Sequence, residues 1–195
     1  MISPGHTLYN PVTGERFTFT HTAGSTGGQL LAFELALRPG GAAPMTHVHP
    51  IQTERFEVLD GLMRFRVGRL KVQAGSGDIV AVPPGVAHSF TNAGDNEARV
   101  RVEVRPALAM EQMLAEAVAM ARAGRMNRRG MPRSMLDLAV LAGKYDQEAH
   151  APLLGVRVQR LLLAPLVIMA RQRRRGPSGA RRNRRNRLTP KGQRR

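Results

Sequence analysis

The stretch GAAPMTHVHPIQTERFEVLDG, residues 41–61, decides how this chain folds and what it can hold. It reads as two short β-strands that carry two histidines, His47 and His49, with Glu54 at the start of the second strand. Residues two apart on a strand direct their side chains to the same face, so the two imidazoles should converge. The segment therefore predicts an imidazole pair and a carboxylate gathered at one point inside a sheet.

A second segment, GDIVAVPPGVAHSFTN at residues 77–92, provides a further imidazole at His88. Unpartnered polar side chains are costly to bury inside a sheet, and a divalent metal would remove that cost. Three neutral imidazoles and one carboxylate suit Fe, Mn, Ni or Zn, and an octahedral ion would keep two positions for water or substrate. The two segments predict an open site for one divalent transition metal.

Glu54 has a competing interpretation as the ion-pair partner of Arg64 or Arg66, in which case Glu57 would take its place at the metal. The spacing favours Glu54, which shares a strand face with Phe56, whereas Glu57 lies on the opposite face.

The remaining histidines, His6, His21 and His150, have no partners at ligand spacing, and we expect them at the surface. Both tyrosines, Tyr9 and Tyr145, lie outside the two segments, so the sequence offers no separate general base. Any chemistry at the site would depend mainly on the metal.

The chain of 195 residues is long enough for one domain with an appendage. It contains no cysteine, which excludes disulfides and thiolate metal sites. The first residues lack the basic start and apolar run of a secretory signal, so we expect a cytoplasmic protein.

The formal charge of +16 is concentrated at the C-terminal end. Residues 171–195 hold 12 of the 30 Lys and Arg residues and none of the 14 acidic ones, which leaves 18 basic and 14 acidic residues elsewhere. A segment with this much charge cannot bury enough apolar surface to fold, so we expect residues 171–195 to be disordered. Nucleic acid is a partner only through this tail, because no helix-turn-helix and no basic and aromatic interleaving is evident.

The sequence pattern changes from β-type to helical near Pro106. Short β-type runs separated by turn signals extend from about residue 7 to Pro106 and predict a sandwich or barrel. Within them, Asp60-Gly61 predicts a two-residue hairpin turn. The expected organisation is mainly β: a β-barrel domain at 1–106, a helical extension at 107–172 and a disordered Arg-rich tail at 173–195.

Three helices are expected in the extension, at 107–124, 135–145 and 156–172. Gly124 should end the first, and Ser134 with Asp137 forms a capping-box start for the second. The apolar part of the third is ten residues long, too short for a bilayer span of about 20. The helices have more apolar surface than one small barrel covers, so we expect a homodimer.

The two segments together resemble the paired motifs of the cupin superfamily. The first runs Gly41, five residues, His47-x-His49, four residues, Glu54, six residues, Gly61; the second runs Gly77, five residues, Pro83-x-Gly85, two residues, His88, three residues, Asn92. The resemblance covers about residues 15–105 and implies a single cupin barrel or jelly roll with metal held by His47, His49, Glu54 and His88. The chain also looks like small bacterial single-domain cupins with a helical C-terminal extension.

Function follows less directly, because the cupin fold hosts many activities. We expect a metal-dependent enzyme of the dioxygenase type that acts on a small oxygenated or aromatic compound, with Glu54 as ligand and catalytic proton acceptor. The first alternative is a non-catalytic cupin that binds or senses a small molecule, its extension serving dimerisation. The second is a nucleic-acid-associated protein that binds through the tail.

Overall fold

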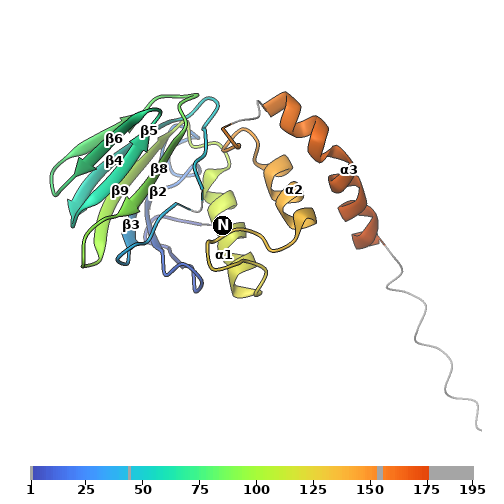
Figure 1. The fold of residues 1–195 in the computed structure, drawn as a ribbon, viewed down its shortest axis with the longest axis horizontal. Coiled ribbons are helices and arrows are strands. Elements are labelled where there is room, and N and C mark those ends of the chain that lie inside the picture. The colour runs from blue at the N-terminus through green and yellow to red at the C-terminus, as the bar shows by residue number, and fades with distance from the viewer. Residues whose placement is uncertain (1, 44, 153–155, 176–195) are drawn as a thin grey trace, which may run out of the picture.

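The computed structural model describes residues 2–43, 45–152 and 156–175. Their strands lie in two antiparallel sheets, which together form a barrel (Figure 1). The larger sheet has the order β1-β2-β3-β9-β4-β7, and the smaller has the order β6-β5-β8. The strands are β1 (Thr7–Tyr9), β2 (Arg16–His21), β3 (Leu31–Leu37), β4 (Thr53–Asp60), β5 (Met63–Val67), β6 (Leu70–Ala74), β7 (Ile79–Val82), β8 (His88–Asn92) and β9 (Ala98–Arg105). The expectation of a mainly β barrel is confirmed.

The core forms because alternate residues of neighbouring strands point inward. In β4, Glu54, Phe56 and Val58 are buried while the residues between them are partly exposed. Phe56 pairs with Val102 of β9, which in turn pairs with Phe33 of β3. Burying a side chain of this kind contributes about 1.5–3 kcal/mol, so such cross-strand rows hold the barrel together.

Gly61 adopts a φ of 86°, as the Asp60-Gly61 pair requires, but the turn does not form a hairpin. β4 pairs with β7 and β9, whereas β5 pairs with β6 and β8. The chain therefore crosses from one sheet to the other at this point, and the hairpin prediction was wrong. A Cβ on Gly61 would lie 2.9 Å from the Cα of Ala98, so the crossing also requires glycine.

In the described part of the chain, three helices follow the strands: α1 (Met110–Arg122), α2 (Met135–Lys144) and α3 (Val156–Arg175). They lie on one side of the barrel, with α1 against the strands and α3 farthest away, packed on α2 (Figure 1). Ser134 caps α2 as expected, since its side chain accepts a hydrogen bond from the backbone N–H of Leu136 at 3.2 Å. Asp137, expected to complete the capping box, pairs instead with Arg125.

Among the described residues, no helix is both long and apolar enough to cross a membrane. α3 continues through residues 173–175, which were predicted to belong to the disordered tail; the predicted tail from 176 onward lies outside the described residues.

Candidate metal centre

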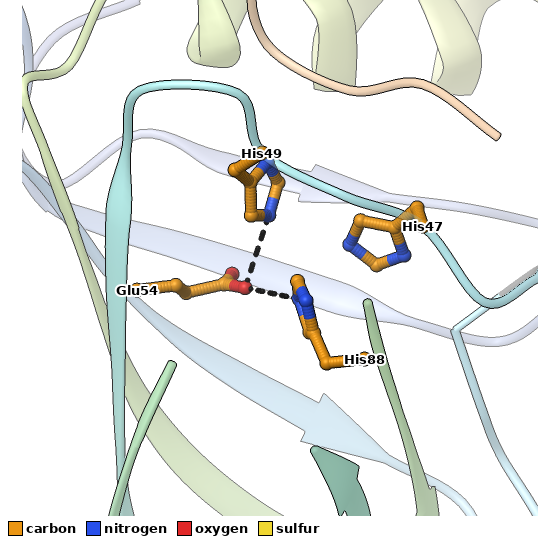
Figure 2. A group of neighbouring side chains, drawn as sticks. All are labelled: His47, His49, Glu54 and His88. Carbon is orange, nitrogen blue, oxygen red and sulfur yellow. Dashed lines mark hydrogen bonds and ion pairs between the residues drawn. The ribbon is translucent and has the colours of Figure 1, made fainter. Parts of the chain in front are cut away.

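Four side chains from the two sequence segments meet inside the barrel. His47 and His49 lie in the segment before β4, Glu54 near the start of β4 and His88 at the start of β8. One nitrogen or oxygen atom from each side chain lies within 4.8 Å of the others (Figure 2). A backbone bridge between His47 and His88, with N–H···O distances of 3.1 and 2.9 Å, joins the two segments. The structure thus brings together all four residues that the sequence singles out.

Glu54 contacts two of the three rings. Its Oε2 lies 3.1 Å from Nε2 of His49 and 2.8 Å from Nε2 of His88. Glu57, the competing candidate, pairs with Arg55 and Arg101 on the outer face of the sheet. The alternative assignment of Glu57 to the site is therefore wrong.

Each imidazole also faces a backbone carbonyl through Nδ1. The carbonyl acceptors are those of Met45 at 3.0 Å for His47, Glu148 for His49 and Val86 at 3.1 Å for His88. A neutral imidazole has a single N–H, and these carbonyls require it at Nδ1. Nε2 of each ring then carries a free lone pair, which can bind a metal.

This arrangement leaves a conflict that a cation resolves. With the proton at Nδ1, the Nε2 lone pairs of His49 and His88 face the carboxylate oxygen of Glu54. Protonating both rings instead would place two positive charges on rings whose centroids are 5.0 Å apart. A divalent ion among the four donor atoms removes both problems, so the residues present fit such a metal.

Burial and mutual charge shift the pKa values of the cluster in different directions. Burial, with the neighbouring His88 and His49, lowers the pKa of His47 to about 4. Burial also acts to lower the pKa of His49, but hydrogen bonding and charge from Glu54 outweigh it, and the pKa is raised. For Glu54, burial favours the neutral acid, yet the neighbouring His49 and His88 outweigh it and hold the pKa of this carboxyl well below the usual range. Glu54 is therefore ionised at neutral pH.

The segment that follows α2 completes the surroundings of His49. Besides the carbonyl of Glu148 at the His49 ring, Val48 and His150 exchange two backbone hydrogen bonds of 3.0 Å. The Glu148 carboxylate accepts a hydrogen bond from the backbone N–H of Ala109, the N-cap residue of α1, at 2.9 Å. The buried Glu148 thus joins the segment that carries His47 and His49 to the start of α1.

A cavity of about 450 Å³ opens beside the cluster, with His47, His49 and Glu54 in its wall. Most of its lining is apolar. The barrel contributes Phe17, Phe33, Leu35, Phe56, Phe90 and Val102, and the helices contribute Met110, Met113, Leu114, Val118, Leu138 and Leu141. The helical extension is therefore one wall of the cavity that the cluster faces.

Several polar residues that line the cavity were not anticipated. Tyr145, His150, Asn10 and Glu15 line the cavity, although the sequence placed the tyrosine outside the site and His150 at the surface. His150 is partly buried and bridged to Val48, so the surface expectation was wrong for it. Contacts between segments that are distant in the sequence bring these residues to the cavity, so no local sequence pattern predicts them.

The fold and the site together define a class of protein: an antiparallel β-barrel whose interior holds three histidines and one glutamate that could bind a metal. Residues 33–105 match the cupin domain family, which identifies this segment of the chain as a cupin domain.

Among solved structures, the chain is similar to TT1209 from Thermus thermophilus, with 26% identity over 50% of this chain and 88% of that one and a TM-score of 0.45. A predicted oxalate decarboxylase from Thermotoga maritima shares 18% identity over 54% and 99% of the two chains, with a TM-score of 0.47. A sugar phosphate isomerase of the cupin superfamily from Silicibacter pomeroyi shares 24% over 48% and 60%, with a TM-score of 0.43. No curated protein matches the chain in sequence.

Proposed function

We propose that the protein is a metal-dependent cupin enzyme of the dioxygenase type, which acts on a small, mostly apolar compound bearing an oxygen donor. His47, His49, Glu54 and His88 would hold one Fe, Mn, Ni or Zn ion. The observation that supports the proposal is the position of this donor cluster in the wall of a mostly apolar cavity of about 450 Å³. A cavity of this size and character suits a drug-sized apolar ligand.

When bound, a divalent ion would supply a Lewis acid and a template for O₂ and an oxygen ligand. The chain's own residues would do the rest. The Phe and Met side chains of the cavity exclude water and hold the apolar body of the substrate. Glu54, ionised and with Oε2 at the centre of the cluster, would accept the proton of a substrate hydroxyl.

The test compares two carboxylates of the same strand. Protein reconstituted with Fe under argon is mixed with a catechol, a flavonol or a 1,3-diketone, and oxygen uptake is followed with an electrode. We expect Glu54→Gln to weaken metal binding and turnover by at least about tenfold, because a neutral amide no longer balances the ion's charge. Glu57→Gln, on the outer face of β4, should leave both unchanged.

Outcomes against the proposal are equally specific. Wild-type protein that retains less than about a tenth of an equivalent of metal after reconstitution would refute the metal site. Ligands that bind the metal-loaded protein without any oxygen uptake would favour a cupin that carries or senses a small molecule.

A further inference from the structure

A buried carboxylate lies in the wall of the cavity away from the metal cluster. Glu15 is only 6% exposed, and the residue lies directly before β2, outside the cupin match at 33–105. Its Oε2 accepts hydrogen bonds from Thr13 Oγ1 at 2.7 Å and from Asn10 Nδ2 at 3.3 Å. No hydrogen bond within the described part of the chain involves its Oε1. One carboxylate oxygen therefore remains to bind a ligand in the cavity.

The turn that holds Glu15 does not need this carboxylate. Its backbone is already closed by hydrogen bonds from Asn10 N–H to the Glu15 carbonyl and from Gly14 N–H to the Asn10 carbonyl, each 2.9 Å. The Asn10 side chain accepts further bonds from Val12 and Thr13. Burying a carboxylate beside an apolar cavity is costly, and burial raises the pKa of Glu15 against the opposing hydrogen bonds of Thr13 and Asn10 and the charge of Arg38. A ligand that hydrogen-bonds Glu15 would offset that cost.

The strand register separates Glu15 from the metal cluster. Glu54 pairs with Val104, and Val104 pairs with Leu31, whereas Arg16, the residue after Glu15, pairs with Ala36. The two rows meet β3 at Leu31 and Ala36, five residue steps apart, which corresponds to about 16 Å along the strand. Glu15 and Glu54 nevertheless line the same cavity. The cavity therefore suits an elongated ligand with a polar group at each end.

We propose that Glu15 binds a hydroxyl or amino group at the far end of an elongated, mostly apolar ligand whose oxygen donor lies at the metal cluster. This inference rests on the proposed function, and it narrows the substrate class to molecules with two polar ends. Glu15 is a specificity residue in this scheme and takes no part in the chemistry.

The probes are two fatty acids that differ only at the far end, dodecanoate and ω-aminododecanoate. Calorimetric titration into the zinc-reconstituted full chain should show that ω-aminododecanoate binds at least about tenfold more tightly than dodecanoate. Only the amino compound can form a charge-assisted hydrogen bond with Glu15. In Glu15→Gln the ratio should fall to within about twofold while dodecanoate binds as before. Glu97→Gln, which alters an exposed carboxylate paired with Arg16, is the matched control and should keep the wild-type ratio.

A chain-length series from ω-aminooctanoate to ω-aminohexadecanoate tests the same idea on the wild-type protein alone, should Glu15→Gln fail to fold. The preference for the amine should appear only when the chain is long enough to reach Glu15. No preference at any length, or a preference that survives in Glu15→Gln, would overturn the inference. Repeating the titrations on metal-free protein separates the two proposals: equal affinities with and without metal would contradict direct coordination, while the amine preference still reports on Glu15.

Discussion

The two walls of the cavity differ in how their residues are encoded. The barrel wall holds the donor cluster, whose members come from segments that the sequence marks by spacing. The helical wall holds apolar side chains of α1 and α2 and the segment after α2, which no motif marks. Yet the carbonyl of Glu148, from this second wall, contacts the ring of His49 in the first. The identity of the donors is therefore encoded locally in the sequence, whereas the orientation of the donors and the shape of the cavity depend on the helical extension.

The largest effect should come from removing a donor on the barrel wall. His88→Ala should reduce metal from close to one equivalent to below about a tenth, because three remaining donors leave an under-coordinated ion and an unpaired carboxylate at Glu54. Elemental analysis of purified protein provides the measurement. His21→Ala, which changes an exposed histidine, should keep the wild-type metal content; equal loss in both variants would point to general destabilisation.

The second largest effect should come from acidification, which should weaken metal binding by the donor cluster. The pKa of His49 is raised above its usual value of 6.5, so protons compete with the metal there first, whereas His47, with a pKa of about 4, remains neutral until far lower pH. Metal affinity should be level above the raised pKa of His49 and fall about tenfold per pH unit below it. Competition with a chromophoric chelator, measured from about pH 5.5 to about pH 8.5, would show this fall in metal affinity. Affinity that stayed constant across this interval would contradict the role given to His49.

A smaller effect should follow from loosening the link between the walls. Glu148→Ala removes the acceptor for the Ala109 N–H at the start of α1, which should lower the free energy of unfolding by about 1–2 kcal/mol. The displaced segment should also weaken metal binding by up to about tenfold, through the His49 ring. Chemical denaturation and chelator competition measure the two effects. Glu148→Gln retains an acceptor and should lose less of both; unchanged metal affinity in Glu148→Ala would mean that the two walls act independently.

The smallest effect should arise within the helical wall alone. Ser134→Ala removes the N-cap of α2 and should lower the free energy of unfolding by about 1 kcal/mol. Metal content should not change, because Ser134 has no contact with the cluster. Ser134→Asp, which retains a capping oxygen, should restore stability. A loss of metal in Ser134→Ala would show that the second wall controls the first more strongly than its contacts indicate.

Much of the barrel and of the helices follows from local patterns. Inward residues alternate along β4 because a strand has a period of two, and the α1 sequence consists of strong helix formers that end at Gly124. The same locality explains the error at Asp60-Gly61. The dipeptide fixes a positive φ but says nothing of the strand that β5 joins, which depends on pairing with β6 and β8.

The sequence alone identified the side chains that carry donor chemistry, because the histidines and the glutamate occur at the characteristic spacings of residues 41–61 and 77–92. The strand predicted over His47 and His49 does not form; these residues lie in a segment held by isolated β-bridges. Only the tertiary structure decided what surrounds them. The contact of His49 with Glu148 joins residues 99 positions apart, and Glu15 and Tyr145, which are 130 positions apart, line one cavity. Such contacts depend on how separately formed elements pack together, and the free energy of that packing is distributed over many apolar side chains rather than written in any short motif.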